Sequence, residues 1–360
     1  MNLAAVRAEL PVLARYAYLN AGTFGPLPRR AVEAMESQHR RDLEEGRSSR
    51  EFFQGALELR ERVRNELTRL IGAPEGSVAL TSSTSEGCAI AVAGLGLGPE
   101  DEIVTTDIEH PGLEGPLRVS GARIRVASIR TRPAAEALDA LEAEITPRTR
   151  LIALSHVAWT TGALLPIRQL ADRGVPLLVD GAQAAGSIPV DVEALGCDFY
   201  TVSGQKWLLG PDATGGLYVR PGREEELRIL VPSYFSWERG TFDPRAGALR
   251  FDSGWIPTAS LQGLASSLAF AQEVGNARFA RAGEMAEMCR ELVGERVRVI
   301  TEPGQSTLIV FEPAGDPAEL VLALHGSGVV VRDLPGLGWV RASVGFWTSE
   351  EDLERLASHL

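Results

Sequence analysis

Short apolar runs alternate with amphipathic stretches through the central part of this chain. Runs at 78–80, 101–106, 123–127, 150–156, 175–179, 199–202 and 215–219 predict strands. Amphipathic stretches between them, such as 134–145 and 167–173, predict helices. Strands that alternate with helices over short connections are typical of an open, mostly parallel sheet. The pattern therefore predicts an α/β fold with a mostly parallel seven-stranded sheet.

Longer helical patterns flank this region on both sides. Apolar residues recur every three or four positions over 51–71, and helices are also expected at 29–46, 257–275 and 277–292. After these, short strands at 297–300, 306–311, 329–332 and 339–343 alternate with helices at 317–325 and 349–356. We expect a large domain over 16–250 and a smaller α+β C-terminal domain over 251–360, with 1–15 packing on the smaller one.

Bulk composition narrows the class of protein. The chain has 360 residues, 44% hydrophobic and 23% charged, which suits a globular protein of about two domains. Its net charge of −12 argues against binding nucleic acid or an anionic membrane, and no apolar run is long enough to span a bilayer. The N-terminus lacks the apolar core of a signal peptide. Cys88, Cys197 and Cys289 show no metal-ligand spacing, nor do the five histidines, so we expect reduced thiols in a cytoplasmic protein without a metal.

Lys206 is the only lysine among 36 lysines and arginines. Unlike arginine, lysine can lose its proton and form a Schiff base. Codon bias is the alternative explanation, but the surroundings of Lys206 favour chemistry. One predicted strand ends in Asp180 and the next runs into Ser203 and Lys206. Pyridoxal phosphate (PLP) needs this pair, because the lysine holds the aldehyde carbon and the carboxylate keeps the pyridine nitrogen protonated.

Hydroxyl side chains run without a break from Thr81 to Ser85, between a strand and a helix. Helix N-terminal N–H groups with Ser83, Thr84 and Ser85 can bind a phosphate, although plain helix capping is the alternative. His110 follows another strand end, where it could stack on a cofactor ring or simply be packed.

Two further segments allow two interpretations each. The glycines and prolines after Tyr18 either form a surface turn or bring Ala21 and Gly22 close to a ligand. The irregular segment 221–254 contains several aromatic residues, which could form a site wall or a subunit contact.

The order of these pieces resembles the class V aminotransferase family of fold-type I PLP enzymes. That group includes cysteine desulfurases, kynureninases and isopenicillin-N-epimerase-like proteins. The resemblance extends from Tyr18-Leu-Asn-Ala-Gly22 to Arg341-Ala-Ser343. Its most specific segments are Val179-Asp-Gly-Ala-Gln183 and Ser203-Gly-Gln-Lys-Trp-Leu-Leu-Gly-Pro211.

The resemblance implies a role for each matching position. Lys206 would form the Schiff base, Asp180 would pair with the pyridinium and His110 would stack on the ring. Arg341 would bind the substrate α-carboxylate, close to Ala21 and Gly22. The residues implied in cofactor binding are Ser83, Thr84, Ser85, His110, Trp159, Asp180, Gln183, Ser203, Gln205, Lys206, Trp255 and Thr258. The family also implies a homodimer with sites between the subunits.

Several positions depart from the family pattern. The segment 331–340 is short and lacks the nucleophilic cysteine of cysteine desulfurases, which excludes a persulfide on that loop. Trp159 replaces an asparagine, Gln205 replaces a frequent histidine, and Trp255 replaces a threonine that reaches the partner's phosphate, with Thr258 nearby. The segment Leu19–Gly25 is closer to the epimerase-like branch.

These observations favour a PLP enzyme that acts on a small L-α-amino acid by transamination or β-elimination. Epimerisation is the alternative within the family, but it usually needs a second base and the chain has no second lysine. A PLP-binding protein without turnover is a rival interpretation. The presence of Lys206, Asp180 and Arg341 together argues against it. A different nucleotide-binding protein is disfavoured because no Gly-x-Gly-x-x-Gly follows the first strands.

Overall fold

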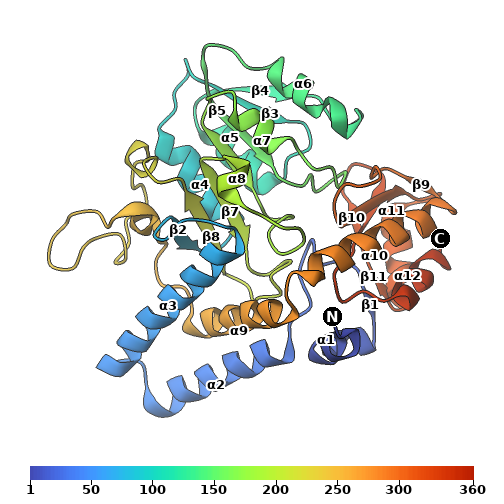
Figure 1. Cartoon of the computed structure of the whole chain (residues 1–360), viewed down its shortest axis with the longest axis horizontal. Coiled ribbons are helices and arrows are strands. Elements are labelled where there is room, and N and C mark those ends of the chain that lie inside the picture. The colour runs from blue at the N-terminus through green and yellow to red at the C-terminus, as the bar shows by residue number, and fades with distance from the viewer.

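The computed structural model describes residues 1–360 as a large part built on one sheet and a smaller part formed mostly after Gly275. Figure 1 shows the smaller part, in orange and red, beside the large one, with both chain termini on its side. No helix of the structure is both long and apolar enough to cross a membrane.

The large sheet has seven strands in the order β2-β8-β7-β6-β5-β3-β4. Their bounds are β2 Val78–Thr81, β3 Glu102–Thr106, β4 Arg123–Ala127, β5 Thr149–Ser155, β6 Leu177–Asp180, β7 Phe199–Ser203 and β8 Gly215–Val219. Only β8 runs antiparallel to its neighbours. The predicted α/β fold with a mostly parallel seven-stranded sheet is therefore confirmed.

Successive residues of these strands point to opposite faces, and both faces are buried in every strand except the edge strand β4. In β5, Ile152 and Leu154 pack on one side, and Leu151 and Ala153 on the other. The first face contacts α3 (Arg50–Leu70), α6 (Ala137–Glu142), α7 (Ile167–Ala171), α8 (Val192–Leu195) and α9 (Thr258–Val274). The second face contacts α4 (Thr84–Leu95) and α5 (Pro111–Val119). Burial on both faces explains why these strands are continuous apolar runs.

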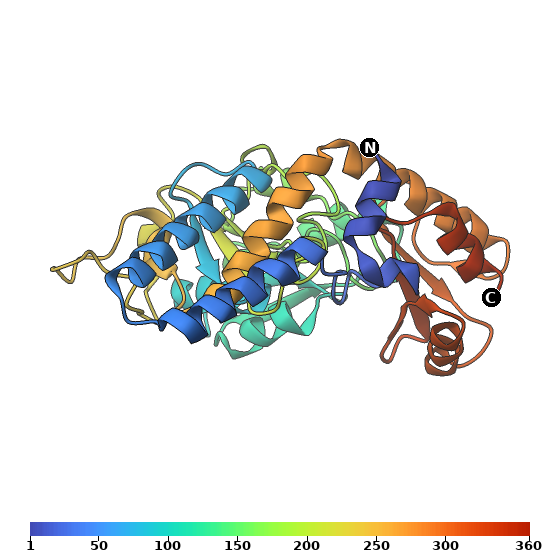
Figure 2. The same cartoon turned by 90° about the horizontal axis from the view of Figure 1, so that it is seen from below.

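Helix α9 packs along α3 and α2 (Arg29–Glu45), and Figure 2 shows the three helices side by side. Leu261, Leu264 and Leu268 of α9 belong to the core under the large sheet. The chain passes to the smaller part at Gly275, whose positive φ of 77° is reached without strain by glycine. The expected division at residue 250 stays a prediction.

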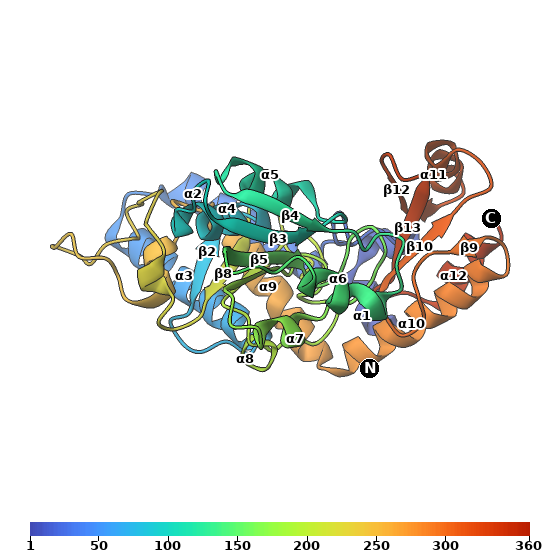
Figure 3. The same cartoon turned by 90° about the horizontal axis from the view of Figure 1, so that it is seen from above.

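The smaller part has a four-stranded antiparallel sheet in the order β12-β13-β10-β9, visible beside the large sheet in Figure 3. Its elements are α10 Ala277–Gly294, β9 Arg298–Val299, β10 Leu308–Glu312, α11 Pro317–Gly326, β11 Val329–Val330, β12 Arg332–Leu334, β13 Trp339–Ser343 and α12 Glu350–Ala357. From the other end of the chain, β1 (Ala17–Tyr18) pairs in parallel with β11, and Arg7 of α1 (Leu3–Glu9) forms an ion pair of 2.6 Å with Asp352. The first residues therefore pack on the last ones.

Candidate active site

Asp180 and Lys206 come from adjacent strands at the same end of the large sheet. Asp180 is the last residue of β6 and faces Thr201 of β7, and Lys206 lies in the turn that follows β7. The chain around Gly25 covers this turn, since the Gly25 N–H donates to the Gln205 carbonyl at 2.8 Å. A β-carbon at position 25 would lie 2.0 Å from the Lys206 carbonyl oxygen, so glycine is required there.

The charges of this pair are tuned by their surroundings. Burial lowers the pKa of Lys206 to about 8; Arg341 and Arg332 act in the same direction, and Asp180 opposes them. Burial raises the pKa of Asp180, although Lys206 and the Ala182 N–H favour its ionised form. The Ala182 N–H donates to Asp180 Oδ1 at 2.9 Å, which fixes the carboxyl group. A lysine with a pKa of about 8 has an appreciable neutral fraction near pH 7, which is suited to nucleophilic and base chemistry.

His110 and Trp159 form a wall of the site. Their rings meet edge to face with centroids 5.2 Å apart. His110 caps α5 by accepting the Gly112 N–H at Nδ1 (3.0 Å), so its neutral ring carries the proton on Nε2. Burial, followed by the charges of Lys206 and the two arginines, lowers the pKa of His110 to about 4. The ring is therefore an uncharged, flat surface at neutral pH.

The hydroxyl run lies at the start of α4, where Ser83 is the N-cap residue and accepts the Glu86 N–H at 3.2 Å. Ser83 therefore caps the helix, which is one of the two roles considered for the hydroxyl run. Thr84 begins the helix, and Ser85 lies against Gly112, where a β-carbon would approach Ser85 Oγ to 2.4 Å. From β7, the Ser203 hydroxyl donates to Gln205 Oε1 at 2.6 Å. Free helix N–H groups next to these hydroxyls are suited to a phosphate.

Gln183 connects the segment around Gly22 to the site. Its Nε2 donates to the Gly22 carbonyl at 2.8 Å, and its Oε1 accepts from Trp207 Nε1 at 3.0 Å. Gly22 is also close to Arg341, since a β-carbon there would lie 2.8 Å from Arg341 Nη2. The structure thus brings the Ala21–Gly22 segment, Gln183 and Arg341 together.

Arg341 lies on β13 and is fully buried, with the backbone oxygen of Trp159 accepting from its Nη1 at 3.1 Å. Six buried side-chain polar atoms have no partner, and four of them lie on the segments around this guanidinium: Trp159 Nε1, Thr160 Oγ1, Arg341 Nε and Ser343 Oγ. Buried donors without partners are uncommon, and here they are suited to an anionic ligand. With the amine of Lys206, the carboxyl of Asp180 and the ring of His110, these residues fit PLP and an amino acid.

Trp255 and Thr258 lie elsewhere in the subunit. Trp255 is 47% exposed and packs against Phe52, Phe53 and Phe235. Thr258 begins α9, in a hollow shared with α2 and α3. Within one subunit, neither residue joins the group around Lys206, so their roles stay predictions that depend on a second subunit.

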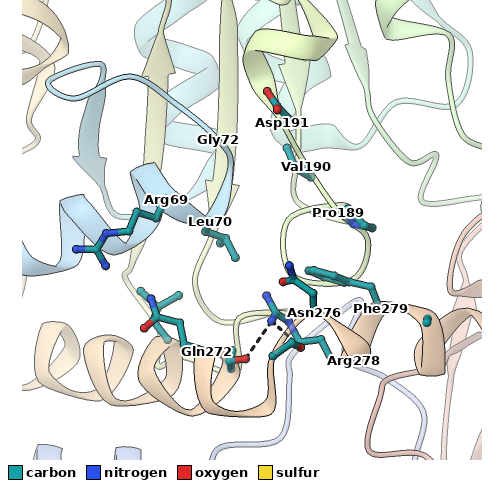
Figure 4. A pocket seen from close by; sticks show the side chains of 14 residues that line it. Arg69, Leu70, Gly72, Pro189, Val190, Asp191, Gln272, Asn276, Arg278 and Phe279 are labelled. Atoms are coloured by element: carbon teal, nitrogen blue, oxygen red, sulfur yellow. Dashed lines mark hydrogen bonds between the residues drawn. The ribbon is translucent and has the colours of Figure 1, made fainter. Parts of the chain in front are cut away.

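A large hollow of about 950 Å³ lies away from Lys206 (Figure 4). It is lined by the end of α3, the segment 189–191 and the junction of α9 with α10, where Arg278 donates to the carbonyls of Ala271 and Gly275. None of the predicted site residues lines it. The chemistry of the side chains, not the size of the hollow, identifies the site.

Three residues of the site were missed from the sequence. Glu109 is buried beside Asp180 and accepts from Thr106 and Ser155. Thr23 and Arg332 lie next to Arg341. In the sequence, Glu109 directly precedes His110 and Thr23 directly follows Gly22, and this proximity to predicted site residues is the only sign of their place in the site. Nothing in the sequence marks Arg332.

The fold and the side chains of this site define a PLP-dependent enzyme of fold type I. The chain belongs to the family described as aminotransferase class-V, whose sequence model matches residues 17–356. The isopenicillin N epimerase of Streptomyces clavuligerus is 31% identical over 95% of this chain and 93% of its own length. A probable cysteine desulfurase of Xylella fastidiosa is 28% identical over 99% of this chain and 94% of its own length.

Solved structures agree with this assignment. The cystine C–S lyase C-DES, in complex with its product cysteine persulfide, has a TM-score of 0.92 and 27% identity, over 97% of this chain and 98% of that one. A C-DES mutant with glycine covalently linked to PLP has a TM-score of 0.91 and 27% identity, over 98% of both chains. The predicted family, the fold type and the cofactor are confirmed, whereas the individual site residues remain predictions.

Proposed function

We propose that this enzyme catalyses β-elimination on an S-substituted L-cysteine, with release of a sulfur-containing product, pyruvate and ammonia. The main support is that the site offers an amine of lowered pKa, Lys206, and no thiol. Cys88, Cys197 and Cys289 are fully buried, and burial raises the pKa of each thiol. A site without a nucleophilic cysteine suits direct C–S cleavage more than transfer of sulfur to the protein.

Bound PLP supplies an electron-poor ring that stabilises negative charge at Cα. Lys206 Nζ would accept the α-proton, and Asp180 would hold a proton at the pyridine nitrogen. The unpartnered Nε of Arg341, together with Nη2, would bind the α-carboxylate and orient the Cα–H bond. The Cβ–S bond then breaks with its electron pair on sulfur, which takes a proton. Water is consumed as ammonia and pyruvate are released.

Epimerisation is the second candidate, supported by the 31% identity to isopenicillin N epimerase. It requires a proton to return to Cα from the face opposite the one it left. His110 is a poor general base at pH 7, because its pKa is lowered to about 4 and its unprotonated Nδ1 already accepts the Gly112 N–H. Transamination, the third outcome, would instead release a keto acid and leave the cofactor in its amine form.

The test is a product assay on the purified holoenzyme with L-cystine, S-methyl-L-cysteine and L-alanine. We expect pyruvate and ammonia in equal amounts from a cysteine derivative, with no net conversion of the cofactor. Lys206→Ala should abolish product and still bind PLP non-covalently. Stoichiometric keto acid with loss of the cofactor's aldehyde form would contradict elimination in favour of transamination, and D-amino acid without pyruvate would favour epimerisation.

We also infer a cytoplasmic homodimer. Phe53, Tyr234 and Trp255 are exposed, and they form one aromatic cluster with Phe52 and Phe235. Such clusters are typical of subunit interfaces, and a partner here would bring Trp255 and Thr258 near another site.

A further inference from the structure

The hollow of about 950 Å³ in Figure 4 lies at the junction of the two parts of the molecule. The end of α3 and the segment 189–191 belong to the large part, and the turn from α9 into α10 forms the opposite wall. Pockets that bind small molecules have volumes of about 300–1,000 Å³ and often lie between domains. The size and the position of this hollow therefore suit a small-molecule ligand.

Arg278 is a buried cation in the wall of the hollow, with 6% of its surface exposed. Its Nη1 donates to the carbonyls of Ala271 and Gly275, each at 3.0 Å, at the end of α9. Its Nε and Nη2 make no hydrogen bond within the chain, and neither atom is among the unpartnered donors that are sealed from water. These two N–H groups are therefore accessible from the hollow that the side chain lines.

No carboxylate neutralises Arg278, whose polar contacts within the chain are the two carbonyls. The other charged residues of the wall have partners: Arg69 pairs with Glu66 at 2.6 Å, and Asp191 caps α8 by accepting the Ala194 N–H at 2.9 Å. Burial lowers the pKa of Arg278. The end of a helix supplies only about half a negative charge. A buried cation that is compensated in part is costly, so the site is suited to an anionic ligand.

Apolar side chains line other parts of the hollow. The guanidinium carbon of Arg278 lies 4.2 Å from the ring centroid of Phe279, so the ring covers one face of the cation. Leu70, Val190 and Leu268 also line the hollow. The edge formed by Nε and Nη2 of an arginine presents two parallel donors, which match the two oxygens of a carboxylate. A carboxylic acid with an apolar body suits both features.

We propose that this hollow is a second binding site, which takes a small organic acid with its carboxylate on Nε and Nη2 of Arg278. The inference goes beyond the proposed reaction, because no residue of the group around Lys206 lines the hollow. The hollow is also separate from the proposed subunit interface. Trp255 precedes the start of α9 and the hollow lies at the other end of this 17-residue helix, about 25 Å away.

The first test measures binding to the holoenzyme. Hexanoate, benzoate and phenylacetate, each paired with its uncharged amide, would be titrated by calorimetry. Acid and amide have nearly the same shape, and they differ in one charge. We expect at least one acid to bind about tenfold more tightly than its amide, as for a charge-assisted pair of hydrogen bonds. Equal affinity within every pair, or no binding by any acid, would overturn the proposal.

The second test assigns the binding to the hollow. Ala280 is an exposed residue of α10 that lines it, so Ala280→Glu adds a negative charge there without removing the bonds of Arg278 to α9. The preferred acid should bind this variant about tenfold more weakly. Ala318→Glu is the matched control, because Ala318 is an exposed alanine of α11 outside the hollow. It should change the affinity less than twofold.

An acid that binds Ala280→Glu as tightly as wild type occupies another site, such as the one around Arg341, and the proposal is then wrong. A third variant, Arg278→Gln, tests the carboxylate contact itself. It should weaken the acid about tenfold and its amide less than twofold. Equal losses for acid and amide would mean that Arg278 only supports the wall of the hollow, which would contradict the proposed contact.

Discussion

Burial and the charges of Arg341 and Arg332 favour the neutral amine of Lys206, against Asp180. Because its pKa is lowered to about 8, roughly a tenth of the side chain is neutral at pH 7, compared with fewer than one in a thousand for an ordinary lysine. We predict that apoprotein recombines with PLP at a rate that rises about tenfold per pH unit below pH 8 and levels off above it. Stopped-flow absorbance would measure the rate. A rate that keeps rising to pH 10 would contradict the lowered pKa.

Glu109 is the second buried acid at the strand ends. Its Oε1 accepts from Thr106 Oγ1 at 2.6 Å, and its Oε2 accepts from the Ser155 N–H at 2.9 Å and hydroxyl at 2.6 Å. Burial raises the pKa of Glu109 to about 7, against these hydrogen bonds, and the charge of Asp180 adds to the effect. The folded state therefore binds this proton more tightly than the unfolded state.

This difference makes stability depend on pH. The contribution of Glu109 is present in full below about pH 4.5 and is lost as the pH rises through 7, at roughly 1.4 kcal/mol per pH unit. Glu109→Gln cannot ionise, so the free energy of unfolding of the variant relative to wild type should rise by about 1–3 kcal/mol between pH 5 and 7. Urea titrations at both pH values would measure it. A difference independent of pH would show that Glu109 ionises normally.

At the residue scale, the sequence identified side chains whose chemistry is unusual in their local context. Lys206 is alone of its type, and Asp180 ends an apolar strand. By contrast, contacts with residues from distant segments place Thr23, Glu109 and Arg332 in the site. Arg332 looks like any other arginine until β12 pairs with β13 and places it opposite Arg341. Spacing along one chain segment does not contain that information.

At the scale of elements, Asp252 ties helix α3 to strand β2. It accepts from Arg60 at 2.9 Å, from Arg64 at 2.8 Å and from the Leu80 N–H at 2.8 Å, and all of these groups are buried. Asp252→Ala leaves buried Arg60 without a carboxylate and Arg64 with Glu61 alone, so we predict a loss of about 3–5 kcal/mol in the free energy of unfolding. Chemical denaturation would measure it.

The control for Asp252 is Glu312→Ala, which removes the partner of exposed Arg298. Exposed pairs contribute about 0–1 kcal/mol, so this variant should unfold nearly as wild type does. If both variants lost similarly little free energy of unfolding, solvent or rearranged side chains would be compensating the charges of Arg60 and Arg64.

The predicted elements differ from the observed ones where propensity and packing disagree. Strands β4 and β8 have the predicted bounds, because alternating apolar residues mark β4 and an apolar run marks β8. Helix α5 was missed, since Pro116 and two glycines lie within Pro111–Val119. Leu113 and Leu117 form its buried face, four residues apart, and their burial outweighs the unfavourable composition. The antiparallel direction of β8 likewise follows from its connection and not from its composition.

At the scale of the molecule, we predict a homodimer that buries the aromatic cluster around Trp255. Trp255→Glu places a charge at the centre of that cluster, so it should weaken association by at least tenfold. Sedimentation velocity at micromolar concentration would measure the change. A control at Leu322, which is 74% exposed on α11, should leave association unchanged on mutation to glutamate. A wild-type monomer would contradict the assembly.

The pairing of β1 with β11 has a consequence for synthesis on the ribosome. Ala17 and Leu19 are buried in the same cluster as Val329 and Val331, nearly the whole chain away. During translation, β1 therefore stays unpaired and exposed to solvent until almost the last residues have emerged from the ribosome. The large sheet needs no such delay, because all its strands lie between residues 78 and 219. A ribosome stalled before β11 would thus hold a chain with a formed central sheet and an exposed apolar N-terminal segment, which is the form that a chaperone would bind.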